Sequence, residues 1–168
     1  MEPILDKARA GQNALEKIAN AIPGFRGYRE KELRRDADRL QREFVASRLD
    51  ENKKALNEMA NAATRSGDLG VINDIEAVRK RLDKVAARVR YADRGYAGFF
   101  DTVKVDEAAL ARVYDIDLGL IQGVEAVEAA AKGSGATSVK ETVAAMAAGI
   151  DALDAQMTDR EAVLNGLK

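Results

Sequence analysis

The chain of 168 residues contains no cysteine and no histidine. Without cysteine it can form neither a disulfide nor a thiolate nucleophile. Without histidine it lacks the side chain that most often serves as a general base near neutral pH and as a zinc ligand. These absences argue against thiol chemistry and histidine-based metal chemistry, and no cofactor is expected.

Proline, aromatic residues and long apolar runs are also scarce. There are two prolines, and aromatic residues make up 5% of the chain. The longest apolar stretch, residues 143–150, is far shorter than the ~20 residues that a membrane-spanning helix needs. The first residues lack a basic segment followed by an apolar one, so no signal peptide is expected. We therefore expect a soluble, cytoplasmic protein.

The residues that dominate instead are alanine, leucine, valine, glutamate, lysine and arginine, most of which lose little side-chain freedom in a helix. Apolar residues recur at alternating steps of three and four, which is the period of an α-helix. This pattern predicts one domain, residues 1–168, that folds as an all-α, antiparallel bundle of four or five helices.

Local signals set the helix boundaries. Pro23 should end the first helix, because proline disfavours helical backbone in the preceding residue. Gly67 and Asp68 can end one helix and cap the next, which joins the second and third helices into a long hairpin. The fourth helix should open at Asp106, where negative charge suits the helix dipole, and Ser138 begins a capping box at the start of the fifth helix. The predicted helices begin near residues 3, 28, 69, 106 and 138, and they end near residues 22, 66, 94, 131 and 164.

The apolar pattern of the second helix changes phase halfway along. Between Phe44 and Val45 the apolar stripe moves sideways by one residue, which corresponds to ~100° of rotation around the helix. A straight helix that packs on a single partner should keep its stripe on one side. Either the first helix covers residues 28–44 and the third helix covers the rest, or the second helix breaks near residues 50–52. The first stripe is Leu33, Ala37, Leu40 and Phe44, and the second is Val45, Leu49, Asn52, Leu56, Met59 and Ala63.

Half of the aromatic residues lie in the stretch 91–106, which glycines interrupt, and two more lie between the first two helices. In an up-and-down bundle both connections lie at the same end, and residues 95–105 can extend ~35 Å to meet the first connection. The rings then either fill this end of the bundle or form, with nearby arginines, a surface that recognises a protein partner. The candidate surface consists of Phe25, Arg26, Tyr28, Arg29, Arg94, Tyr96, Phe99 and Phe100.

Charge is distributed unevenly along the chain. Residues 1–100 carry 21 Lys+Arg and 16 Asp+Glu, whereas residues 101–168 carry 6 and 12, so the two parts should attract each other. Between residues 26 and 42 the charges alternate at helical spacings, for example Asp38 with Arg42, as on a solvated face. On the third helix Arg81, Lys84 and Arg88 follow one line. This basic face either docks on the acidic helices or contacts nucleic acid or an anionic membrane.

Carboxylates offer the remaining candidate chemistry. Asp117 falls on the apolar stripe of the fourth helix, so we expect it to pair with an arginine, either Arg34 or Arg94. Glu125 and Glu128 could share a face and hold Mg²⁺, as a metal-dependent helical hydrolase would require, but this is the least favoured function and no metal site is predicted. Two glycines one turn apart, Gly119 and Gly123, should allow close helix packing.

The segments GYREKELRRDADR (residues 27–39) and YADRGYAGFFDTVKV (residues 91–105) resemble parts of an uncharacterised family of prokaryotic all-helical proteins. This resemblance implies a helical, bacterial protein and assigns no function. The long hairpin is also similar in geometry to the phage-shock type of membrane-stress protein. We expect a non-enzymatic adaptor or scaffold that acts by protein–protein interaction, with another protein or with a second copy of itself. The alternative is an adaptor whose basic face contacts an anionic membrane or nucleic acid.

Overall fold

A computed structural model describes residues 2–92, 99–100, 105–133 and 138–166, and within these ranges the chain forms five α-helices and no β-strand. A short 3-10 helix, η1, precedes α2. The predicted all-α fold is confirmed. The helices are α1 (Glu2–Ala21), η1 (Lys31–Leu33), α2 (Arg34–Ser66), α3 (Leu69–Arg90), α5 (Glu107–Ala131) and α6 (Val139–Leu164).

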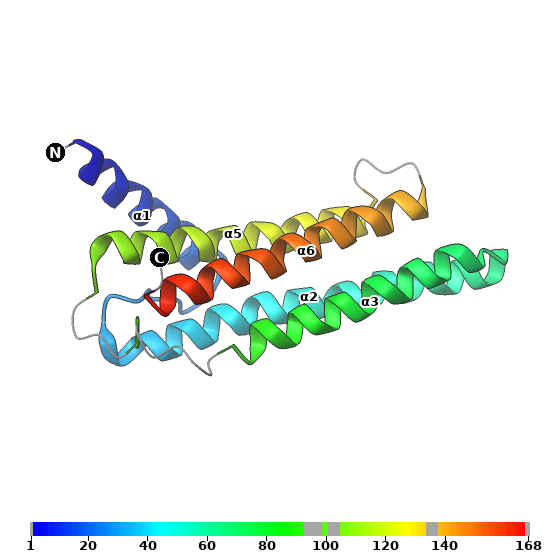
Figure 1. Ribbon diagram of the computed structural model, residues 1–168, viewed down its shortest axis with the longest axis horizontal. Coiled ribbons are helices and arrows are strands. Elements are labelled where there is room, and N and C mark those ends of the chain that lie inside the picture. The colour runs from blue at the N-terminus through cyan, green and yellow to red at the C-terminus, as the bar shows by residue number, and fades with distance from the viewer. Residues whose placement is uncertain (1, 93–98, 101–104, 134–137, 167–168) are drawn as a thin grey trace.

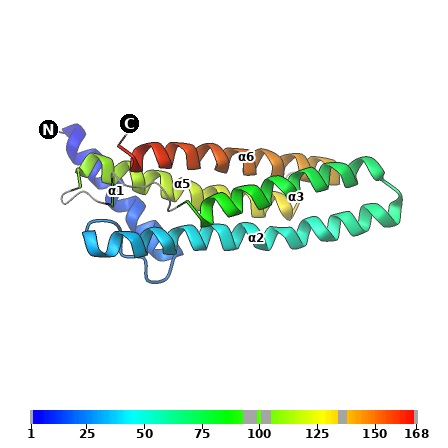
Figure 2. The same ribbon diagram turned by 60° about the horizontal axis from the view of Figure 1, so that its bottom comes forward.

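The long helices form two antiparallel hairpins, α2–α3 and α5–α6, that lie against each other (Figures 1 and 2). α2 packs on α3, α3 on α6, α6 on α5 and α5 on α2, so the four helices enclose one core. α1 is added to the outside of α5. We call the end with the α2–α3 turn the distal end, where this turn extends past α5 and α6 (Figure 1). The opposite end, with α1 and residues 22–33, is the proximal end.

The helix ends follow the predicted capping signals. Gly67 takes the left-handed conformation (φ 74°) that ends α2, and the Asp68 carboxylate accepts a hydrogen bond from a backbone N–H in the first turn of α3. Asp106 and Ser138 cap α5 and α6 in the same way. In the described part of the chain, no helix is both long and apolar enough to cross a membrane.

α2 differs from the prediction at its start and in its buried face. It begins at Arg34 rather than near Tyr28, and it continues through residues 50–52 without a break. Its buried positions keep one phase along the whole helix, so the expected step does not occur. The first half of this buried face is mostly polar, so the spacing of apolar residues does not reveal it. Ala37 is the one apolar member of that first half. The buried residues of α2 are Arg34, Ala37, Asp38, Gln41, Arg42, Val45, Ala46, Leu49, Asn52, Leu56 and Ala63.

The predicted partner of α1 is also wrong. α1 packs on α5 and does not cover residues 28–44. The contact is close because small residues meet: a Cβ on Gly11 would lie 3.1 Å from that of Ala111. The packing of α5 on α6 does use the predicted glycines, since a Cβ on Gly123 would lie 2.6 Å from the Leu153 side chain. The α3 seam is buried as predicted, at Val71, Ile75, Val78, Leu82, Val85 and Val89.

Candidate functional site

The described aromatic rings of the candidate surface lie inside the proximal end. Phe25, Tyr28, Phe99 and Phe100 are all buried, with Tyr28 only 1% exposed. The Tyr28 ring meets Phe25 and Phe99 edge-on, with centroids 5.5 and 5.8 Å away, and stacks on Tyr114 at 5.6 Å. These rings fill the end of the bundle, as the packing interpretation expects, and in this conformation they form no surface for a partner.

The other members of that candidate surface are arginines and Tyr96. Arg26 and Arg29 are exposed, and the Arg29 guanidinium lies 2.6 Å from the Glu107 carboxylate. Because both groups of this pair are well exposed, the pair is worth little stability. Arg94 and Tyr96 lie outside the described residues. The structure therefore does not bring the eight residues together as one exposed patch.

Two arginines at the start of α2 contact Phe99 and Phe100. The buried Arg34 donates from Nε to the Tyr28 carbonyl at 2.7 Å and from Nη1 to the Phe99 carbonyl at 3.3 Å. Its guanidinium lies 5.4 Å from the Phe99 ring centroid, and that of Arg35 lies 5.1 Å from Phe100. Phe99 and Phe100 thus lie at the start of α2 and next to the first connection, where the length of their segment predicted that it could reach.

Beneath the rings lies a buried ion network, formed by Asp38, Arg42, Asp117, Arg160 and the Tyr28 hydroxyl. Arg160 lies at its centre. Its Nε is 2.6 Å from Asp117 Oδ1, its Nη1 is 2.8 Å from Asp38 Oδ1, and its Nη2 donates to Tyr28 Oη at 3.1 Å. The Tyr28 hydroxyl in turn donates to Asp117 Oδ2. The network joins α2, α5, α6 and the first connection.

Arg42 extends this network to α3. Its Nε lies 2.8 Å from Asp38 Oδ2, and its Nη1 donates to the carbonyls of Val89 and Arg90 in the last turn of α3. A cation is favourable there because the helix dipole is negative at this end. The spacing rule correctly predicted that Asp38 pairs with Arg42. It wrongly placed the pair on a solvated face, since both side chains are buried.

Asp117 pairs with an arginine, as expected, but the partner is Arg160. Arg34 instead binds backbone carbonyls, and Arg94 lies outside the described residues. A sequence signal for Arg160 did exist: it continues the apolar stripe of α6 between Met157 and Leu164 at helical spacing. Burial raises the pKa of the Asp117 carboxyl above its ordinary value, and the Arg160 guanidinium opposes that rise.

The Tyr28 hydroxyl should make stability depend on pH in alkali. Burial, and then the Asp117 carboxylate, raise its pKa well above the ordinary value of about 10, although Arg160 opposes this shift. Above pH 10 the unfolded chain therefore loses this proton while the folded chain keeps it, so stability falls as pH rises. Tyr28→Phe removes this effect.

We expect Tyr28→Phe to lower the free energy of unfolding by about 1–3 kcal/mol at pH 7, because Asp117 and Arg160 each lose a partner. The difference from wild type should then shrink by about 1.4 kcal/mol per pH unit above pH 10. Urea unfolding at several pH values measures both effects. The pKa of Tyr114 is also raised, but this group is present in both proteins, so its contribution cancels in the difference. A difference that stays constant from pH 9 to pH 11.5 would contradict this assignment.

Gln41 lies on the same buried line of α2, and neither atom of its side-chain amide has a hydrogen-bond partner among the described residues. A buried amide without partners lowers stability, so an apolar side chain of similar shape should do no harm. We expect Gln41→Met to be neutral or to stabilise by about 1–3 kcal/mol. Thermal unfolding tests this, with Gln122→Met on the exposed face of α5 as the control. Clear destabilisation would show that the amide is hydrogen-bonded in solution.

The basic face of α3 docks largely on the acidic face of α6. Arg81 lies 3.1 Å from Asp151, and Arg88 lies 2.6 Å from Asp154 and also pairs with Glu161. Of the three predicted residues, only Lys84 is exposed without such a pair in the described structure. The predicted attraction between the two parts of the chain is confirmed. A nucleic acid or an anionic membrane would have to compete with these ion pairs for the basic face.

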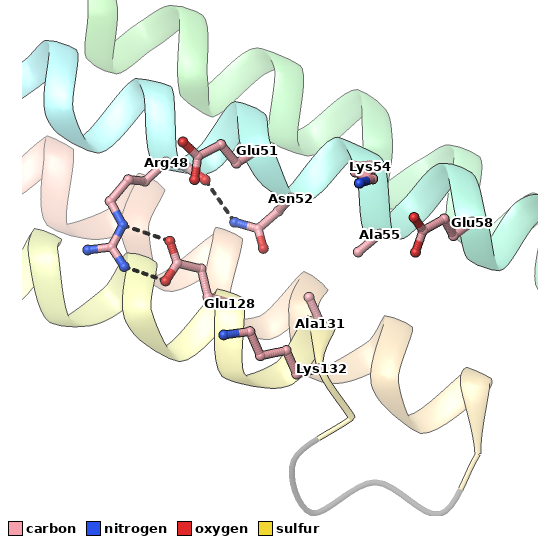
Figure 3. Close-up of a pocket in the computed structure, with 9 residues that line it drawn as sticks. All are labelled: Arg48, Glu51, Asn52, Lys54, Ala55, Glu58, Glu128, Ala131 and Lys132. Atoms are coloured by element: carbon pink, nitrogen blue, oxygen red, sulfur yellow. Dashed lines mark hydrogen bonds and ion pairs between the residues drawn. The ribbon is translucent and has the colours of Figure 1, made fainter.

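A hollow of about 400 Å3 lies between α2 and the end of α5 in the distal half (Figure 3). Arg48 spans it and binds both carboxylate oxygens of Glu128, one of them at 2.7 Å from Nε. Glu125 lies 3.8 Å from the same guanidinium, so Arg48 occupies the carboxylate pair that had suggested a metal site. The lining residues are Arg48, Glu51, Asn52, Lys54, Ala55, Glu58, Glu128, Ala131 and Lys132.

Within the described residues, no cluster of three or more acidic side chains is placed to hold a metal ion. Comparisons with known protein families, with curated proteins and with solved structures find no match for this chain. The resemblance of residues 27–39 and 91–105 to an uncharacterised helical family therefore stays a prediction.

Proposed function

We propose that this chain is a non-enzymatic adaptor or scaffold that acts by protein–protein interaction, and that the hollow between α2 and α5 is its interaction surface. The observation that supports this most is the lining of the hollow (Figure 3). Six of its nine residues are charged, with both signs present around the Arg48–Glu128 pair. Small-molecule pockets of this volume are instead mostly apolar with a few polar groups.

The charges also have the spacing of one helix face. Glu51, Lys54 and Glu58 lie three and four residues apart on α2, so their side chains are neighbours along the hollow. Lys132 lines the opposite side of the hollow from the end of α5, with its amine directed toward the Glu128 side. A polypeptide segment with alternating charges can match such a row at several points, which gives specificity and fixes orientation. Ala55, at the centre of the row, leaves room for the partner.

The ion network at the proximal end supports the non-enzymatic part of the proposal. General acid–base catalysis needs a titratable group within hydrogen-bonding reach of a substrate. Asp38 and Asp117 instead each pair with Arg160, and all three side chains are shielded from solvent. Charges that are buried in this way stabilise a particular arrangement of helices and loops.

The proposal is tested by affinity capture from a lysate of the source organism with wild type, Ala55→Arg and Ala129→Arg. Ala129 is exposed on α5 outside the hollow, so the same substitution there serves as the matched control. We expect a partner that wild type and the control capture equally and that Ala55→Arg loses at least tenfold. All three proteins should unfold at similar temperatures. Equal capture by all three would overturn the assignment of the hollow.

A further inference from the structure

A second, apolar groove of about 240 Å3 runs between α3 and α6 in the distal half. Val78 and Val143 form its buried floor, and alanines form its walls. On α6 the wall residues Ala144 and Ala147 continue at helical spacing to Asp151, where the ion pair with Arg81 closes the groove toward the proximal end. The lining residues are Asp74, Ala77, Val78, Arg81, Lys140, Val143, Ala144 and Ala147.

The charges at the distal end of this groove differ from those at the proximal end. Arg81 is paired with Asp151 and Arg88 with Asp154, which holds α3 and α6 together there. Asp74 on α3 and Lys140 on α6 are both exposed, and neither forms an ion pair with a described residue. Within the described structure, the groove thus has an anion without an ion-pair partner on one wall and a cation without one on the other.

The shape and lining of the groove indicate which kind of polypeptide fits. Strand addition needs an exposed sheet edge, and the described chain has no strand. Extended proline-rich segments dock between aromatic rings, and the described residues that line this groove include no aromatic side chain. A trough of valine and alanine between two helices suits the apolar face of a third helix. Asp74 and Arg81 are ~10 Å apart along α3, which corresponds to two helical turns.

We propose that the α3–α6 groove binds one amphipathic helix of a partner protein, with a carboxylate placed against Lys140 and a cation against Asp74. The partner lays apolar side chains, spaced three and four residues apart, on Val78 and Val143. The two opposite charges fix its direction in the groove. This inference depends on the proposed role in protein–protein interaction but concerns a surface other than the α2–α5 hollow, so the two are tested separately.

The test uses a displayed library of 18-residue helical peptides. Four positions on one face vary among Leu, Ile, Met and Ala, and the flanking positions vary among Glu, Lys and Gln. Selection on wild type should enrich an apolar row with Glu on one side and Lys on the other. The methyl NMR signals of Val78 and Val143 should shift on binding. Selection on Asp74→Lys/Lys140→Glu should enrich the opposite charges.

A matched pair of variants shows where the peptide binds. Ala144→Arg, in the groove wall, should weaken binding at least tenfold, whereas Ala152→Arg, exposed on α6 outside the groove, should not. Both variants replace an alanine with arginine, which is also a strong helix former, so α6 itself should stay intact. The inference is overturned if no peptide is enriched, if the charges do not reverse, or if Ala144→Arg binds like the control. If the groove fails these tests but Ala55→Arg still loses the partner captured from the lysate, the proposed function holds and only the inference about this groove is wrong.

Discussion

Arg160→Met should lower the free energy of unfolding by about 3–5 kcal/mol, because it leaves the carboxylates of Asp38 and Asp117 buried without their shared cation. Methionine has a similar length and a good helix propensity, so the change removes the charge with little effect on α6 itself. Arg42 can still pair with Asp38, but among the described residues Asp117 keeps only the Tyr28 hydroxyl as a partner. We expect the loss to fall mainly on Asp117.

Urea unfolding at pH 7 measures this loss, and Arg81→Met on the surface is the control. The Arg81–Asp151 pair is more than half exposed on both sides, so its removal should change stability by no more than about 1 kcal/mol. If Arg160→Met and Arg81→Met lose similar amounts of stability, water reaches the network in solution and the network is not a sealed core.

Gly27→Ala should destabilise the protein by about 3 kcal/mol or more, through two separate effects. Gly27 has a φ of 85°, which an alanine adopts only with strain. A Cβ there would also collide with the Tyr114 hydroxyl and lie 3.1 Å from the Leu15 side chain. The Tyr114 hydroxyl accepts the backbone N–H of Tyr28 at 2.9 Å, so displacing it leaves a buried donor without a partner.

Gly67→Ala separates the two effects. Gly67 has a similar φ of 74°, but a Cβ there would meet no atom within 4 Å. The Gly67→Ala variant should lose only the stability that the backbone strain costs, about 1 kcal/mol. The difference in unfolding free energy between the two variants then measures the effect of the collision with Tyr114. Calorimetric unfolding of both proteins gives this difference. Equal losses would mean that Tyr114 does not approach Gly27 closely in solution.

The parts of the fold that the sequence predicted correctly depend on local signals. Gly67 and Asp68 determine the turn between α2 and α3 within a few residues, and Asp106 and Ser138 begin their helices with their own side chains. The apolar seam of α3 has a clear period because its buried positions are all apolar. These features need no information about distant parts of the chain.

The proximal end could not be predicted in the same way, because its buried face is charged. Arg34, Asp38 and Arg42 lie on the core side of α2, where an apolar pattern was expected. The spacing of Asp38 and Arg42 is local, and it correctly indicated a pair. Their burial depends on Arg160, 43 positions from Asp117 and on a different helix, and on rings from both connections. A charged residue on an otherwise apolar stripe, such as Arg160, is the signal that would have found this network.

The ion network also bears on the order of folding. Tyr28 and Arg160 are hydrogen-bonded although 132 positions separate them in the sequence, whereas the α2–α3 hairpin closes over a turn of two residues. The entropy lost on closing a loop grows with its length, so local hairpin contacts should form before the network assembles. Interactions that form after the rate-limiting step mainly slow unfolding. The buried charges should therefore lengthen the lifetime of the folded bundle more than they speed its formation.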